Sequence, residues 1–254
     1  MLIPLVVIFF LTSIVSVVTG STSLITVPAL LFFGMDARVA VATNMFALIF
    51  LSAGATYPFL KSNHIHRPRL PLLVGLTLAG SVMGALLLVN VPTDLMPLLI
   101  ALFMLAMVVF SVLNPQAGVE TGRTPSRKAE LGGYAATLIL GIYGGFFSGG
   151  YVTLLTAAYV ALFGMAYIQA VATTKVINIF SSLVATAIFI SQGLVDFEWG
   201  LVLGAAMLAG GMVGARIALR VSNTWLRRIF LASVVLLALK LLLYDVVWQM
   251  WLAR

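Results

Sequence analysis

Gly34-Met35-Asp36-Ala37-Arg38-Val39-Ala40-Val41-Ala42-Thr43-Asn44 returns 130 residues later as Gly164-Met165-Ala166-Tyr167-Ile168-Gln169-Ala170-Val171-Ala172-Thr173-Thr174. A second match has the same offset: Leu78-Ala79-Gly80 with Gly84-Ala85 returns as Leu208-Ala209-Gly210 with Gly214-Ala215. The chain therefore contains two copies of one unit. Because duplicated membrane chains usually build their functional site where the copies meet, the repeat also indicates where a site is expected.

The composition is that of a membrane protein. Hydrophobic residues make up 62% of the 254 residues, charged residues 8%, and the mean hydropathy is +1.17. The apolar runs reach the roughly 20 residues that a membrane helix needs, and they lack the alternation of a membrane barrel. We therefore predict an all-α polytopic membrane protein with eight apolar segments. They are 2–33, 39–60, 70–91, 95–113, 131–163, 170–190, 199–219 and 226–247.

The basic residues indicate membrane topology rather than a nucleic-acid partner. The net charge is +7, but the bases lie in short clusters between apolar runs. The chain has no cysteine, which excludes disulfides and thiolate metal sites, and His64 and His66 are expected in a solvated loop. Neither a metal nor a cofactor is predicted. The first residues lack a basic n-region, so the first segment is expected to be retained.

Two apolar segments are too long for one simple crossing. Residues 2–33 are interrupted by Thr19-Gly20-Ser21-Thr22-Ser23, and residues 131–163 by Gly144-Gly145 and Ser148-Gly149-Gly150. Each is predicted to be two short helices joined at a break. A hairpin and a pair of short crossings give the same loop placement. We favour hairpins, because the ten residues Leu24–Phe33 at ~1.5 Å per residue reach only about halfway across the bilayer.

Loop charges predict that the two copies are inverted. The stretch 61–69 carries Lys61, Arg67 and Arg69 without an acid, whereas its counterpart carries Asp196 and Glu198 without a base. The sign reverses again between the stretch around Asp94 and its counterpart, which holds Arg216, Arg220, Arg227 and Arg228. Equivalent loops thus lie on opposite faces. We predict two inverted repeats of one hairpin and three spans, up to ten helices in all.

The predicted boundaries are a first repeat at 1–114, a linker at 115–130 and a second repeat at 131–254 within one membrane domain. Positively charged loops stay in the cytoplasm, so the linker and the loop 61–69 are expected inside and both termini outside. The lipid bilayer is one expected partner. The sequence leaves a monomer and a homo-oligomer both open.

The sequence resembles the sulfite exporter TauE/SafE family, also called the toluene sulfonate uptake permease family, over nearly its whole length. The residues that carry the resemblance are the glycine-rich break from Gly141 to Gly150, then Gly164-Met165, Ala170–Thr173 and Gly210–Gly214. The first break departs from the pattern, with Ser21-Thr22-Ser23 where the family has glycines. The resemblance implies a carrier for small anions, commonly sulfur oxyanions or organosulfonates, in a prokaryotic plasma (inner) membrane.

The two breaks are the main candidate for a substrate site. A helix that starts inside the membrane leaves about four amides without intrahelical partners and directs its positive dipole end at the break. The residues Gly20, Ser21, Thr22 and Ser23, with Ser148, Gly149 and Gly150, could thus hold an anion near the midplane. The alternative is structural: glycines permit close crossing and serines cap helices.

Lys175 lies within an apolar segment where the first copy has Met45. A buried base usually faces a cavity or a partner, and an anion would compensate its charge. The alternative is snorkelling to the near interface, which is also the reading favoured for Lys240.

Several neutral polar residues complete the candidate set. They are Thr43 and Asn44, with Thr173, Thr174 and Asn178 at related turns of the second copy, and Tyr143 beside the second break. Each could donate to an oxyanion, or could serve as interhelical contact or packing.

No acid falls in the middle of an apolar segment, which disfavours a proton relay through a buried carboxylate. Motifs of intramembrane proteases and nucleotide-driven pumps are also missing from the sequence, so no enzyme is predicted. The prediction is a secondary anion transporter working by alternating access around a midplane site. A passive anion channel and a non-catalytic scaffold subunit are the alternatives.

Overall fold

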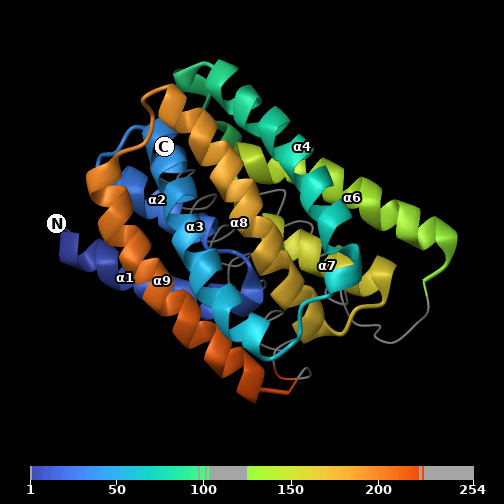
Figure 1. Cartoon of the computed structure of the whole chain (residues 1–254). Coiled ribbons are helices and arrows are strands. Elements are labelled where there is room, and N and C mark those ends of the chain that lie inside the picture. Colours follow the sequence, from blue (N-terminus) through green and yellow to red (C-terminus); the bar gives the residue numbers. More distant parts are fainter. Residues whose placement is uncertain (1, 97, 101, 103–124, 223–224, 226–254) are drawn as a thin grey trace, which may run out of the picture.

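The protein is helical throughout the part described by its structure, a computed structural model covering residues 2–96, 98–100, 102, 125–222 and 225 (Figure 1). The first half contains α1 (Leu2–Thr19), α2 (Ser23–Phe32), α3 (Ala37–Lys61) and α4 (Leu70–Asn90). The second contains α6 (Arg127–Phe146), α7 (Tyr151–Phe163), α8 (Tyr167–Ser191) and α9 (Phe197–Arg220). Short 3-10 turns occupy Arg67–Arg69 and Thr93–Leu95.

Most of the predicted segments 95–113 and 226–247, the linker up to residue 124, and Lys240 lie outside the described residues. The linker's last four residues, 127–130, are helical, because α6 begins at Arg127 after a Ser126 cap. Five of the described helices are long and apolar enough to cross a membrane: α1, α3, α4 with its preceding turn, α8 and α9. These findings confirm the predicted class of polytopic helical membrane protein.

The repeat is present in the geometry as well as in the sequence. Helix α3 spans 37–61 and α8 spans 167–191, and the turn and helix at 67–90 match α9 at 197–220, so the bounds keep the offset of 130. Left-handed backbone recurs at the same offset, in Gly20 and Gly150, in Gly34 and Gly164, and in Asn63 and Gly193. Ser148, also left-handed, is matched by Val18, which lies within α1.

Equivalent helices of the two repeats point in opposite directions. The hydroxyl of Thr43, near the start of α3, accepts a hydrogen bond from the Asp196 amide, beyond the end of α8, at 3.0 Å. In the same way Thr173, near the start of α8, accepts from the His66 amide, beyond the end of α3, at 3.0 Å. Helices α3 and α8 are therefore antiparallel neighbours, as the prediction of inverted repeats requires.

Both broken segments are hairpins. Helix α1 runs parallel to α9, since Gly210 lies against Phe10 and Gly214 against Ile14. Helix α9 runs parallel to α3, since Gly200 lies against Phe46 and Gly204 against Phe50. Because α2 ends only a few residues before α3 begins, α1 enters and α2 leaves at the same end of the molecule. The α6–α7 hairpin enters from the opposite end (Figure 1).

The contacts between described helices divide the molecule into two groups that cut across the repeats. Helices α1 and α3 pack against α9, and α2 packs against α1 and α3. We call these four helices the first body. Helices α6 and α8 pack against α4, and α7 packs against α6 and α8. These four helices are the second body. The bodies meet chiefly through α3 and α8. Each repeat therefore contributes its fourth described helix to the other body.

Small residues allow α4 and α9 to pack against helices of the other repeat, an arrangement that we call the exchange of helices. An added Cβ at Gly84 of α4 would lie 1.9 Å from the Ile142 carbonyl oxygen of α6, and one at Gly214 of α9 would lie 2.4 Å from the Ile14 carbonyl oxygen of α1. The backbones are thus in direct contact at the predicted small-xxx-small faces. At both sites a glycine replaces the side chain that would separate the two helices.

The charged residues separate by sign toward the two ends of the bundle. One end, here called the basic end, carries the C-terminus of α3, the loop that follows it, the start of α6 and the end of α9, which contribute Lys61, Arg67, Arg69, Arg127, Lys128, Arg216 and Arg220. Arg69 pairs with Glu130 of α6 there. The other, acidic end carries Asp36, Asp94, Asp196 and Glu198, together with Arg38. Helix α1 begins at the acidic end.

Candidate functional site

The two helix breaks lie against each other inside the molecule. A Cβ added to Gly20 would lie 2.6 Å from the Thr153 amide nitrogen at the start of α7. A Cβ added to Gly149 would lie 2.9 Å from the Leu24 side chain at the start of α2. Ser21, Thr22 and Ser148 are all buried at this contact. The structure thus brings together the residues of both breaks that the sequence singled out.

Both breaks leave backbone amides without acceptors. Within the described residues, the amides of Ser21, Thr22 and Ser23 form no backbone hydrogen bond. At the second break the same holds for Gly149, Gly150, Val152 and Thr153 within that part of the chain. Buried amides are nearly always paired in proteins, by protein, water or ligand. Two buried helix N-termini thus adjoin, each with unpaired amides. Their N–H groups and helix dipoles create a positive potential that suits an anion.

Side chains on α2 and α3 fix the first break. The amide of Asn44 donates to the Ser23 hydroxyl at 2.9 Å and accepts from the Thr26 hydroxyl at 2.6 Å. The hydroxyls of Thr19 and Ser21 share a hydrogen bond of 3.0 Å across the break. In the second repeat the equivalents of Thr26 and Asn44, Thr156 and Thr174, share a hydrogen bond of 3.2 Å. Asn44 and Thr174 thus position the short helices of the hairpins.

The carbonyl end of α1 is bound by three side chains of the second repeat. The Thr153 hydroxyl donates to the Thr19 carbonyl at 2.5 Å, and the Tyr167 hydroxyl donates to the Val18 carbonyl at 3.2 Å. The Lys175 ammonium donates to the Ser16 carbonyl at 2.9 Å. A cation at a helix C-terminus is favoured by the helix dipole. These bonds hold the first break to α7 and α8.

Lys175 is 1% exposed, and its ammonium points to Ser16 in the protein interior rather than to an interface. No carboxylate partner is found for it among the described residues, where Arg69 and Glu130 form the ion pair. Its equivalent, Met45, is also buried. The second repeat therefore places a basic side chain in the centre of the molecule that the first repeat lacks, and an anion could compensate its charged form.

Tyr143 and Ser148 shape the second break. The Tyr143 hydroxyl donates to the Gly149 carbonyl, which joins the last turns of α6 to the break. Ser148 has a φ of 63°, a left-handed conformation that costs a non-glycine residue energy and is found most often at functional sites. Its strained backbone makes the second break asymmetric with the first.

Thr43, Thr173 and Asn178 lie along the α3–α8 contact. The two threonine hydroxyls hold the loops before α9 and α4, as described above, and so belong to the two ends rather than to the breaks. The Asn178 amide donates to the Ser52 hydroxyl of α3 at 2.7 Å. Its oxygen and the hydroxyls of Thr56, Ser182 and Thr186 are buried without partners in the described part of the chain. A polar seam therefore runs between the two bodies.

Sequence reasoning missed four residues of this site: Thr26, Ser52, Thr153 and Tyr167. The repeat itself offered a signal for one pair, because Thr26 and Thr156 are both threonines at equivalent positions. Thr153 and Tyr167 left no such signal, since their equivalents are Ser23 and Ala37 and their acceptors are carbonyls 134 and 149 residues away. Their roles follow only from the exchanged packing of the repeats.

Inverted hairpin repeats with helix N-termini meeting in the interior define the protein as a membrane transporter in architecture. The comparisons agree with this class. The sequence profile of the sulfite exporter TauE/SafE family matches residues 5–241, and the chain belongs to that family.

Three curated relatives are similar over most of their length. A probable membrane transporter protein, ORF9, from Sinorhizobium sp is 27% identical over 92% of this chain and 89% of the relative. A probable membrane transporter protein from Haemophilus influenzae is 27% identical over 94% of this chain and 93% of its own. The probable membrane transporter protein YfcA from Escherichia coli K12 is 28% identical over 90% of this chain and 84% of its own. No solved structure matches the chain.

Proposed function

We propose that the protein is a secondary carrier that moves a small anion, of the sulfur oxyanion or organosulfonate class, across a prokaryotic inner membrane. The observation that carries the proposal is the meeting of two buried helix N-termini whose amides have no acceptor in the described residues. Amides of this kind bind oxyanions through short hydrogen bonds and the positive ends of the helix dipoles. The family name supplies the substrate class.

The residues in this proposal have three roles: direct contact with the anion, positioning of the breaks and charge compensation. The amides of Ser21–Ser23 and those of Gly149, Gly150, Val152 and Thr153 contact the oxyanion directly. The hydroxyls of Thr22 and Ser148 supply further donors. Asn44, Thr174 and Tyr143 position the breaks through their hydrogen bonds. Lys175 supplies the compensating positive charge from the α1 end of the site. No residue of the set is given a catalytic role.

Alternating access follows from the two bodies. The breaks are buried, so an anion can reach them only when α3 and α8 separate at one end. The unpaired hydroxyls along that contact would be hydrated when it opens. Separation of α3 and α8 would therefore give hydrogen-bond partners to groups that lack them in the closed contact. Rigid movement of one body against the other would open first the basic and then the acidic end. The positive-inside rule orients the basic end to the cytoplasm, with α1 beginning outside.

Uptake into proteoliposomes tests the function. The purified protein is reconstituted and assayed with sulfite, thiosulfate, an aryl sulfonate and, as a non-sulfur control, acetate. A carrier gives saturable uptake and accelerated exchange when unlabelled substrate is placed on the far side. Flux that rises linearly with concentration, without such exchange, would contradict a carrier and indicate a channel. No flux with any of the sulfur anions would contradict the substrate class.

A further inference from the structure

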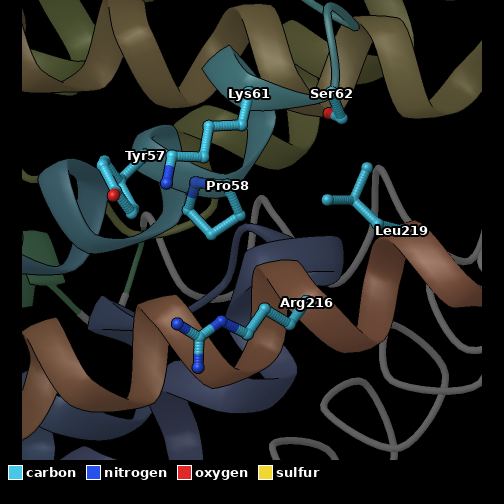
Figure 2. A pocket seen from close by; sticks show the side chains of 6 residues that line it. All are labelled: Tyr57, Pro58, Lys61, Ser62, Arg216 and Leu219. Atoms are coloured by element: carbon cyan, nitrogen blue, oxygen red, sulfur yellow. The ribbon is translucent and has the colours of Figure 1, made fainter.

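A hollow of about 310 Å³ lies at the basic end between α3 and α9, away from the helix breaks. Tyr57, Pro58, Lys61 and Ser62 form one side, and Arg216 and Leu219 of α9 form the other (Figure 2). We call it the α3–α9 pocket. Its lining includes the apolar side chains of Pro58 and Leu219, and its polar groups are an ammonium, a guanidinium and two hydroxyls.

The two cations of the α3–α9 pocket have no acidic neighbour. Neither Lys61 nor Arg216 forms an ion pair in the described residues, where the bridge that is found joins Arg69 to Glu130. The Lys61 ammonium lies 4.5 Å from the centre of the Tyr57 ring, within range of a cation–π contact. Two positive groups thus share one concave site without a counterion from the protein.

The position of the α3–α9 pocket indicates that its ligand lies at the membrane surface. Lys61 is in the last turn of α3, and Arg216 is one turn before Arg220, the last residue of α9, so the cations lie where both helices leave the bilayer. Tyr57, 49% exposed, is an interfacial side chain with an apolar ring and a polar tip. Basic pockets between helices on the cytoplasmic side are suited to anionic lipid headgroups.

The pseudo-symmetry provides an internal comparison. At the acidic end the equivalents of Tyr57, Lys61 and Arg216 are Ala187, Ser191 and Leu86, none of which is basic or aromatic. The exchange of helices would place the same hollow there, but without the groups that bind an anion. The α3–α9 pocket is thus built at one membrane face only.

We propose that the α3–α9 pocket binds a phosphate-type oxyanion, supplied by the headgroup of an anionic phospholipid and held between Lys61 and Arg216. The lipid phosphate would accept from both cations, while its chains lie along the apolar side of α9. This site is independent of the transported anion, because it lies at the helix ends and not at the breaks.

Lipid binding to the purified full-length protein tests the proposal. Titration with phosphatidylglycerol is followed by native mass spectrometry and by thermal unfolding in a neutral detergent, with phosphatidylcholine and inorganic phosphate as comparison ligands. Each base is expected to contribute about fivefold, so the double variant K61Q/R216Q should bind phosphatidylglycerol about twenty-fivefold more weakly than wild type. The charge-conserving variant K61R/R216K, which also reports that the fold tolerates substitution there, should keep the binding.

Arg220→Gln is the matched control, since it removes a base from the same helix and the same end but outside the pocket lining. Its affinity for phosphatidylglycerol should equal that of wild type. Equal loss in Arg220→Gln and K61Q/R216Q, or wild-type binding by K61Q/R216Q, would overturn the proposal. Inorganic phosphate that binds as tightly as phosphatidylglycerol would overturn the lipid as the source of the oxyanion.

Discussion

At the residue scale, Gly20 shows how closely the first break packs against the start of α7. It has a φ of 73°, and an added Cβ would meet the Thr153 amide nitrogen at 2.6 Å. Two effects therefore act on any larger residue there, backbone strain and a clash with backbone that cannot rotate away. The site depends on the absence of that one carbon atom.

Gly20→Ala is expected to destabilise the protein by more than about 3 kcal/mol and to abolish transport, because strain and overpacking add. Gly34→Ala is the control, since Gly34 has a φ of 89° but no atom within 4 Å of the added Cβ. It should cost only the strain, about 1 kcal/mol. Thermal unfolding in detergent measures both. Equal losses at the two positions would show that the contact between the breaks is not tight.

Substitutions at Lys175 can separate the effect of its charge from the effect of its hydrogen bond. Lys175→Gln keeps a donor for the Ser16 carbonyl but removes the charge, so the fold should be retained. The apparent affinity for the anion should fall about tenfold or more, the range of a lost charge-assisted hydrogen bond. Lys175→Met, which introduces the residue found at the equivalent Met45, should also lower the apparent affinity. Uptake by Lys175→Gln with wild-type affinity would show that Lys175 serves only as a hydrogen-bond donor to the end of α1.

At the element scale, one threonine in each repeat ties a loop to the start of a long helix. Thr43 holds the loop before α9, and Thr173 holds the loop before α4. Since a net hydrogen bond contributes about 1 kcal/mol, Thr43→Val and Thr173→Val should each lower the free energy of unfolding by about that amount. Denaturant or thermal unfolding checks this. A fall in substrate affinity with unchanged stability would instead place these hydroxyls at the substrate.

The loop before α4 should respond to pH. Burial and the neighbouring Arg69 lower the pKa of His66 below its usual 6.5. The folded state therefore disfavours the charged imidazole, so this contribution to stability is present above pH 6.5 and is lost as the pH falls through the lowered pKa. Unfolding temperatures measured from pH 8 to pH 5 should drop more for wild type than for His66→Gln. Parallel profiles would contradict the assignment.

Much of the element level could be predicted from the sequence, because its causes are local. The hairpin breaks follow from residues such as Gly20 and Gly150, and the inversion follows from the charges of short loops. The partners of the polar residues could not be predicted. Whether Thr43 meets a substrate or the Asp196 amide depends on which helix lies opposite, and no periodicity encodes that.

At the scale of the whole molecule, Gly80 and Gly84 illustrate the same limit. Their spacing predicts a close helix contact, and α4 does touch backbone there. The sequence does not say that the partner is α6, across the repeat boundary, rather than a helix of the same repeat. The exchange of helices, and with it the composition of the two bodies, therefore had to come from the structure.

Cross-linking can test the two bodies, because the chain has no cysteine of its own. Ser52 and Asn178 are hydrogen bonded at 2.7 Å across the α3–α8 contact between bodies. Ser81 and Ser181 are hydrogen bonded at 2.7 Å within the second body. Oxidation of S52C/N178C should stop transport, reversibly with a reductant, whereas oxidised S81C/S181C should transport normally. Inhibition by both disulfides would contradict movement of these bodies as rigid units.

The exchanged helices also bear on how the protein is made. While the first repeat emerges from the ribosome, α4 has neither of the long helices that it packs against, because α6 and α8 are still to be translated. Its glycine face at Gly80 and Gly84 therefore has no helix packed against it until the second repeat is inserted, and the same holds for the face of α3 that contacts α9. Assembly is therefore a late event that needs both halves inserted, and a nascent chain stopped after the first repeat has no native core to complete.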